Sequence, residues 1–366
     1  MTTLDNLYSS TSGGSGLVPT LDDLPSVLRL GTRRSQLART QSQWFADRLV
    51  AALALVAPER EFRVELVEVV TSGDVSAASN TPLTSLGGTG VFVSALREAV
   101  LRDECDFAVH SLKDLPNAQP EGLTLASVPR RECPADVLIG RDDLGFDELP
   151  AGSVIGTGSP RRAAQMLALR DDIKIVGIRG NIDTRIGKVA TGEVDAVVLA
   201  LAGLRRIGRH AEATHVFTSE QMLPAPGQGA LAVECRSETN GSVALLAALR
   251  LIDDAVTRLC VLAERALLAR LEAGCAAPVG ALATYQNSGG DQTLTLTAFA
   301  GSTDGTTSIR HTATARTRDP RTDEPVAITL GRALAEQMLD AGAALLIPVP
   351  DPVPAADEAL AREGDS

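Results

Sequence analysis

The hydrophobic and polar positions between residues 27 and 250 follow a repeating plan. Short apolar runs such as SVIG (153–156) and DAVVLA (195–200) lead into longer segments whose apolar residues recur every three or four positions. Runs of the first kind are typical of buried strands, and segments of the second kind are typical of amphipathic helices. The alternation predicts an α/β fold in which helices cover parallel or mixed sheets.

Two further patterns indicate how this fold is divided. Residues 30–41 (LGTRRSQLARTQ) echo residues 155–165 (IGTGSPRRAAQ), as expected of two α/β domains with a similar plan. After Gly229 the pattern changes, and a third, smaller α+β domain is predicted. Its expected elements are a strand (229–236), a helix (253–272) capped by Asp253 or Asp254, two strands around Asp304-Gly305, and a last helix (326–342).

Charge and composition narrow the possible ligands. The net charge of −12 and the aromatic content of 3% disfavour a nucleic-acid partner, because they supply neither a basic surface nor stacking platforms. Arginines nevertheless occur in local groups, each able to bind a small anion. These groups are Arg33–Arg34, Arg130–Arg131, Arg161–Arg162, Arg179 with Arg185, and Arg205–Arg206.

Cysteine spacing and hydropathy predict a metal-free cytoplasmic protein. The five cysteines form no CxxC pair, so neither a metal site nor a disulfide framework is expected. No apolar stretch reaches the roughly 18 residues that a membrane span needs. No Lys or Arg precedes Arg29, so neither a signal peptide nor a transit peptide is expected. Residues 1–26 are predicted to be a disordered tail and residues 349–366 a flexible one.

Two arginine-rich turns predict an anion site. In GTGSPRR (156–162), Ser159 suits a helix N-cap and Pro160 the first helical position, so two arginines follow a helix N-terminus. In GIRGNIDTR (177–185), Arg179 follows an apolar strand and Arg185 lies one turn into the next helix. The alternatives are solvated arginines on a capped helix and a surface ion pair with Asp183. Together the two turns favour a polyanionic ligand.

The segment DFAVHSLKDLP (106–116) places several reactive side chains at the end of a buried strand. If the chain stayed extended, His110 and Asp114 would share one face, whereas a turn would separate them. A carboxylate near cations could stabilise a positive charge or move a proton; capping and ion pairing are the alternative.

Two more segments leave their purpose open. The glycine-rich TSLGGTGVF (84–92) suits either a mobile lid or a structural turn, and it lacks the pattern of a nucleotide-binding loop. Cys275, in LEAGCAAPVG, has no activating neighbour in the sequence, which favours an inert small residue over a nucleophile.

Nine segments in a fixed order resemble the porphobilinogen deaminase (hydroxymethylbilane synthase) family. They are RLGTRRSQLARTQ, TSGD, GGTGVFVSALREAV, DFAVHSLKDLP, GTGSPRRAAQ, RGNIDTRIGK, LALAGLRRIG, LPAPGQGALAVECR and ERALLARLEAGCAAPVG. The resemblance implies two α/β lobes like those of type II periplasmic binding proteins, with the active site between them, and a smaller α+β domain that carries the cofactor. The implied domains are 27–130 with 225–247, 131–224, and 248–348.

The resemblance also implies a reaction and its residues. Family members condense the small molecule porphobilinogen head to tail into hydroxymethylbilane, on a dipyrromethane cofactor whose thioether would form here at Cys275. Asp114 matches the family's catalytic aspartate, and a monomer is implied. The positions that match binders of the pyrrole carboxylates and their polar neighbours are Arg33, Ser35, Gln41, Lys113, Thr157, Ser159, Arg161, Arg162, Arg179, Arg185, Arg206 and Gln228.

One segment departs from the family pattern. Ser85, Thr89 and Ser94 stand where many relatives carry lysines, so this glycine loop would approach the cleft with less positive charge. The rival hypothesis is a two-lobed anion-binding protein without catalysis. Such a protein would need neither Asp114 nor a modified Cys275.

Overall fold

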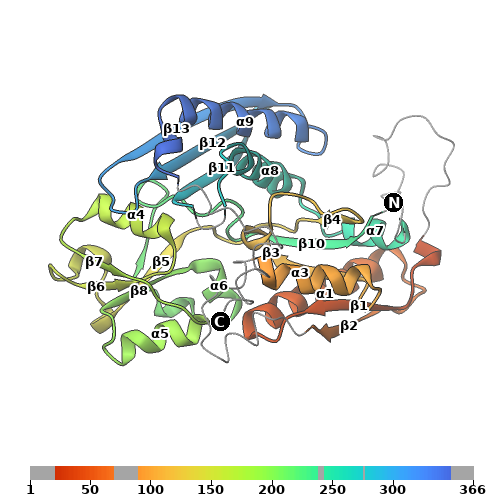
Figure 1. The fold of residues 1–366 in the computed structure, drawn as a ribbon. Coiled ribbons are helices and arrows are strands. Elements are labelled where there is room, and N and C mark those ends of the chain that lie inside the picture. Colours follow the sequence, from red (N-terminus) through yellow and green to blue (C-terminus); the bar gives the residue numbers. More distant parts are fainter. Residues whose placement is uncertain (1–20, 70–89, 238–242, 275–276, 348–366) are drawn as a thin grey trace, which may run out of the picture.

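Three sheets organise the protein in a computed structural model that describes residues 21–69, 90–237, 243–274 and 277–347 (Figure 1). Two sheets have five strands, in the orders β2-β1-β3-β10-β4 and β7-β6-β8-β5-β9, and the third has the order β11-β12-β13. In both larger sheets, the second strand in this order (β1 or β6) runs parallel to both of its neighbours. The fourth strand (β10 or β5) runs antiparallel to the third. The predicted fold class of two similar α/β lobes and a smaller α+β unit is confirmed.

The first sheet is covered by helices on both faces. Its strands are β1 (Val27–Thr32), β2 (Arg63–Glu68), β3 (Phe107–Ser111), β4 (Leu123–Ser127) and β10 (Leu231–Arg236), and its helices are α1 (Gln36–Val56), α3 (Gly90–Leu101) and α7 (Val243–Arg250). Phe107 packs edge-on against Phe45 of α1, with ring centroids 5.9 Å apart. Ala108 points the other way, into the cluster that α3 covers. Successive side chains of β3 thus pack against opposite faces of the first sheet.

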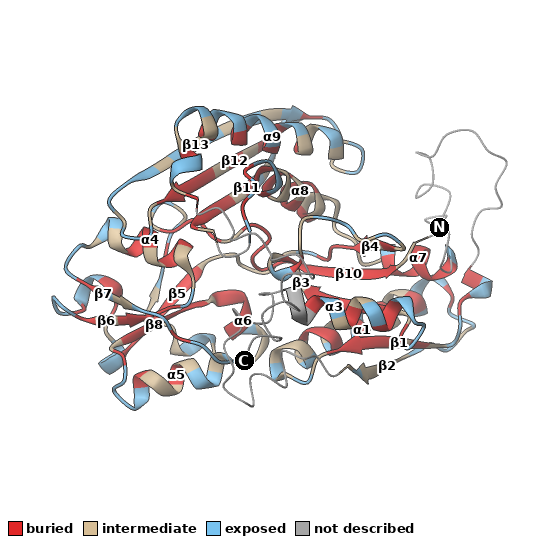
Figure 2. Ribbon diagram, in the orientation of Figure 1, coloured by how far each residue is buried: buried red, intermediate tan, exposed pale blue. Residues whose placement is uncertain are grey.

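The second sheet repeats this arrangement with shorter strands. These are β5 (Asp136–Gly140), β6 (Val154–Gly156), β7 (Lys174–Val176), β8 (Ala196–Ala200) and β9 (His215–Val216), with helices α4 (Pro160–Leu169), α5 (Ile182–Ala190) and α6 (Leu201–Arg206). All five residues of β5 are buried, as Figure 2 shows for the centre of this sheet. β5 is therefore an inner strand of the sheet. Its first residue, Asp136, is its only acid and is fully buried.

The third sheet packs on two long helices (Figure 1). It consists of β11 (Val279–Ser288), β12 (Asp291–Gly301) and β13 (Ser308–Thr317), and it packs on α8 (Ala255–Arg270) and α9 (Glu324–Asp340). Both predicted helices and the hairpin around Asp304-Gly305 are confirmed, and Asp254 is the N-cap of α8. The strand expected at 229–236 is instead β10 of the first sheet. β11 was not predicted, because its second half is polar and mostly exposed.

The N-terminal part differs from the expected tail. Leu21–Asp23 form the short 3₁₀ helix η2, and Leu21 and Leu24 are buried in the first core. The guanidinium of Arg60 donates hydrogen bonds to the carbonyls of both leucines. The prediction of a disordered tail is therefore wrong for residues 21–26. Within the described ranges, no helix has both the length and the apolar character to cross a membrane.

Candidate functional site

The candidate site is built around a turn at the end of β3. After Ser111 the chain forms the 3₁₀ helix η4 (Leu112–Asp114), so it does not stay extended and His110 and Asp114 do not share a strand face. Leu112 and Leu115 are buried, three positions apart, and hold residues 112–116 (the 112–116 turn) against the core. Asp114 itself is exposed. The turn thus presents a carboxylate to solvent on a fixed backbone.

Lys113 links this turn to the second sheet. Its Nζ donates to Oε1 of Gln228 at 3.2 Å, and Nε2 of Gln228 donates to Oδ1 of Asp136 at 2.9 Å and to the Pro134 carbonyl at 2.7 Å. Burial lowers the pKa of Lys113 to about 8, although the charge of Asp114 opposes the shift. Because burial disfavours the charged form of Lys113, an additional anion nearby would stabilise that form.

Asp136 holds the predicted arginine pair in the interior. Oδ2 of Asp136 lies 2.8 Å from Nη1 of Arg161, and Oδ1 accepts hydrogen bonds from Nε and Nη2 of Arg162 at 3.0 and 2.7 Å. Burial raises the pKa of Asp136, but the two arginines outweigh that effect and hold the pKa below its usual range. Ser159 caps α4 and Pro160 begins it, as predicted. The alternative of solvated arginines is wrong.

Two other arginines carry charge into the same region. Nε of Arg185 donates to the Gly180 carbonyl at 2.8 Å, and Nη2 of Arg206 donates to the Gly229 carbonyl at 2.7 Å. Within the described part of the chain, neither forms an ion pair with a carboxylate. Burial lowers the pKa of Arg206 to about 10, and burial together with the charge of Arg162 lowers that of Arg185. Both cations are therefore suited to an anionic ligand.

The charge of Asp114 raises the pKa of Arg185, against those two effects. Asp114, on the first lobe, is thus within electrostatic reach of Arg185 on the second. The structure brings the carboxylate and the cations of the two lobes to one site.

The remaining predicted polar residues stabilise local structure. Ser35 accepts a hydrogen bond from the Ala38 N–H as N-cap of α1, and Oγ1 of Thr157 accepts one from the Ser159 N–H at 3.2 Å. Gln41 is buried in α1, and its Nε2 donates to Oγ of Ser111 at 3.3 Å. Gln41 therefore connects α1 to the end of β3.

Arg33 and Arg179 lie in loops after strands. Arg33 directly follows β1, and its charge contributes to the lowered pKa of His110. Arg179 is exposed between β7 and α5. Asp183 forms its ion pair with Arg209, so the suggested surface pair between Asp183 and Arg179 or Arg185 is not found in the described ranges.

Part of the prediction lies outside the described residues. The predicted residues outside the described ranges are Cys275, Ser85, Thr89 and the glycine loop up to residue 89. Ser94 lies in α3. In the described ranges, no group of three or more His, Cys, Asp or Glu side chains is arranged to hold a metal ion.

A buried polar cluster beside β3 was not predicted. Glu234 of β10 accepts hydrogen bonds from Nε and Nη2 of Arg97, both at 2.9 Å, and its Oε2 lies 3.4 Å from Nε2 of His110. Burial lowers the pKa of His110 to about 4; Glu234 opposes this shift, and Arg97 and Arg33 add to it. His110 is thus neutral near pH 7 and serves as a packing residue beside the site.

The change His110→Gln tests this assignment. As the pH falls from about 6.5 towards about 4, the unfolded parent chain takes up a proton on His110 that the folded protein excludes, so the parent loses stability. The variant lacks this loss, and the stability difference between the two proteins should shift in its favour. Urea unfolding at several pH values measures this, with His210→Gln at an exposed position as the control. Identical pH dependence of His110→Gln and the parent would contradict the lowered pKa.

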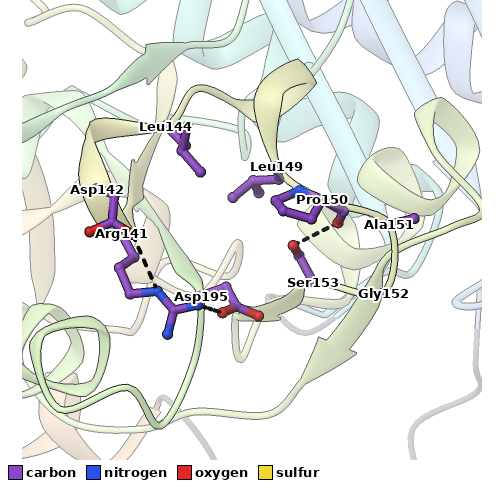
Figure 3. Close-up of a pocket in the computed structure, with 9 residues that line it drawn as sticks. All are labelled: Arg141, Asp142, Leu144, Leu149, Pro150, Ala151, Gly152, Ser153 and Asp195. Atoms are coloured by element: carbon purple, nitrogen blue, oxygen red, sulfur yellow. Dashed lines mark hydrogen bonds and ion pairs between the residues drawn. The ribbon is translucent and has the colours of Figure 1, made fainter.

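A separate pocket of about 290 Å³ lies in the second lobe (Figure 3). It is lined by Arg141, Asp142, Leu144, Leu149, Pro150, Ala151, Gly152, Ser153 and Asp195. Its polar groups satisfy one another: Arg141 pairs with Asp195, and the Ser153 hydroxyl donates to the Pro150 carbonyl at 2.7 Å. No predicted site residue lines it, so it is not part of the candidate site.

Comparisons with known proteins identify two family models and several similar chains. Residues 28–243 match the family model described as porphobilinogen deaminase, dipyromethane cofactor binding domain, and residues 258–340 match that of the porphobilinogen deaminase C-terminal domain. The chain is 51% identical to a porphobilinogen deaminase of Thermobifida fusca over 86% of its own length and 94% of the relative's. It is also 51% identical to porphobilinogen deaminase 1 of Streptomyces coelicolor, over 88% and 97% of the two lengths.

Solved structures give more distant matches. They include the periplasmic VFT2 domain of Bordetella pertussis BvgS, with 17% identity and a TM-score of 0.36 over 62% of this chain and 86% of that domain. The substrate binding domain 2 of Lactococcus lactis GlnP has 12% identity and a TM-score of 0.38 over 62% and 88% of the two chains.

Proposed function

Because the chain belongs to the porphobilinogen deaminase family, we propose that the exposed carboxylate of Asp114 is its catalytic group. The protein is a transferase that condenses porphobilinogen head to tail, with loss of ammonia, into linear hydroxymethylbilane. It uses a dipyrromethane cofactor. The observation that carries the proposal is the position of Asp114 on the η4 turn, beside Lys113 and within electrostatic reach of Arg185.

The proposed role of Asp114 is electrostatic and acid–base. Loss of ammonia from porphobilinogen leaves a cationic pyrrole, which a nearby carboxylate stabilises without forming a covalent bond. The same carboxylate can accept a hydrogen bond from a pyrrole N–H and take the proton released as two rings join. Asp114 is exposed and forms no ion pair with another residue of the described ranges, so it can approach the reacting atoms without first leaving such a pair.

The cations around Asp114 fit a ligand made of pyrroles. Each pyrrole ring carries an acetate and a propionate, and Lys113, Arg185 and Arg206 are desolvated cations in need of anions. We assign carboxylate binding to these three and to Arg33 and Arg179. Arg161 and Arg162 would contribute as a buried positive pair whose position Asp136 fixes. When bound, the dipyrromethane supplies the pyrrole carbon to which substrate rings are joined.

The proposed attachment point of the cofactor is Cys275. We expect the intact mass of the purified protein to exceed the mass of its sequence by one dipyrromethane, because a thiolate is a good nucleophile for the deaminated pyrrole. Cys275→Ser should lose this extra mass and the colour reaction for dipyrroles. The matched control is Cys260→Ser, because the Cys260 thiol is buried in α8 and its pKa is raised to about 12. A fully active protein without added mass would contradict this assignment.

Three further properties belong to the same proposal. The domains would be 27–130 with 225–247, 131–224 and 248–348, which is supported by the pairing of β10 with β3 and β4. A cytoplasmic location is supported by the free thiols of Cys105, Cys133, Cys235 and Cys260. A monomer is expected from the family. The non-catalytic anion-binding alternative is not supported, because the relatives that cover nearly the whole chain are deaminases.

A further inference from the structure

The helix that leads towards Cys275 also grips the backbone beside Asp114. α8 ends at Arg270, shortly before Cys275 in the sequence. From this helix, Nη1 of Arg265 donates to the carbonyl of Leu115 at 3.1 Å, and its Nη2 donates to the carbonyl of Pro116 at 2.7 Å. These carbonyls belong to the two residues that directly follow Asp114. A planar guanidinium that holds two consecutive carbonyls restricts both the position and the orientation of the peptide between them.

An apolar contact from the same helix supports this grip. Val261 lies one helical turn before Arg265, so both side chains project from the same face of α8. Val261 is buried in one cluster with Leu112 and Leu115, which flank Asp114 in the 112–116 turn. The turn is therefore held by α8 at its apolar side chains and at its carbonyls.

The neighbouring Glu264 contacts the turn indirectly, through Gly227. Its buried carboxylate accepts hydrogen bonds from Arg131 at 2.6 and 3.1 Å and from the Gly227 N–H at 2.7 Å. Gly227 lies so close to the turn that a Cβ there would come within 3.1 Å of Leu112 Cγ and 3.3 Å of the Lys113 nitrogen. Its positive φ of 75° adds strain to any substitution. Through Gly227, α8 thus has a second connection to the 112–116 turn, besides the direct contacts of Arg265 and Val261.

We propose that Arg265 is a positioning residue for the condensation, because it holds the backbone that carries Asp114 at a fixed place relative to α8. This inference rests on the proposed catalytic role of Asp114. It assigns the catalytic carboxylate and the helix before the cofactor cysteine to one rigid unit. Arg265 acts on Asp114 through the peptide groups of Leu115 and Pro116.

The test is a double-mutant cycle on the holoenzyme. Arg265→Met should lower kcat about 10- to 100-fold with KM nearly unchanged, since a displacement of a catalytic group by about 1 Å has effects of this size. In the Asp114→Asn background the same change should have almost no further effect, because it acts through that carboxylate. Arg265→Lys, which retains one donor group, should recover part of the rate. Intact mass confirms that each variant carries the cofactor.

The control is Arg270→Met on the same helix. Arg270 is exposed and pairs with Glu336 on α9, so its loss should leave kcat at the parent value. An equal loss from Arg265→Met in both backgrounds, or no loss in the parent, would overturn the positioning role. If Arg265→Met does not fold, Arg265→Lys is read by the same cycle. Near-normal turnover of Asp114→Asn alone would instead refute the proposed catalytic role of Asp114.

Discussion

The change Asp114→Asn is expected to lower turnover by about 10²- to 10⁴-fold, the range that electrostatic and acid–base groups contribute. The amide keeps the size of the side chain but removes the negative charge that would stabilise a cationic pyrrole. Because Asp114 is exposed, folding and cofactor attachment should be unaffected. Turnover is measured by porphobilinogen consumption, and cofactor content by intact mass.

A matched surface change provides the control for this experiment. Asp171→Asn removes an exposed carboxylate of the second lobe outside the site, and it should behave as the parent protein does. A kcat of Asp114→Asn close to the parent value would remove Asp114 from the mechanism. A loss of the thermal transition would show that the residue has a structural role instead.

The change Asp136→Asn is expected to cost about 3–5 kcal/mol of unfolding free energy, which is typical of removing one partner from a buried ion pair. Asp136 is fully buried and is the shared partner of Arg161, Arg162 and Gln228. Without its charge, two buried guanidinium groups lose their counterion. Urea unfolding at pH 7 measures the loss.

The loss should depend on pH in a defined direction. The folded-state pKa of Asp136 is lowered, so its stabilisation is complete above the unfolded value of about 4 and disappears as the pH falls below it. The gap between parent and variant should therefore be constant from pH 5 to 8 and narrow in stronger acid. Asp172→Asn, which removes the partner of Arg170 at the surface, should change stability little. A loss below about 1 kcal/mol for Asp136→Asn would contradict its role as shared counterion.

The sequence predicted the elements whose signals are local. Ser35 and Ser159 cap the helices they precede, and the alternating strands and helices form the expected sheets. Hydrophobic period and capping chemistry depend on neighbours within a few residues, so they can be interpreted without knowledge of the fold. The family motifs that led to the hypothesis for Asp114 and the arginines are likewise short local stretches of sequence.

The partners of those residues could not be predicted. In the sequence, Asp136 is the first residue of the apolar run DVLIG (136–140), and Arg265 lies within the helix predicted at 253–272. Their roles depend on contacts across 26 and 149 or more sequence positions, respectively, which no local pattern specifies. The local signals that could have suggested them are an acid at the start of an apolar strand and the adjacent Glu264 and Arg265 in a long helix.

The position of β10 imposes an order on how the chain is completed during synthesis. This strand (Leu231–Arg236) lies between β3 and β4 and pairs with both, yet every strand of the second sheet precedes it in the sequence. A growing chain therefore contains all strands of the second sheet before it contains β10, the strand that completes the first sheet. Until translation passes residue 236, β3 and β4 lack the strand that joins them, and until it passes residue 270 the 112–116 turn lacks α8. The proposed catalytic carboxylate of Asp114 is thus synthesised well before the strand and the helix that hold its turn in place.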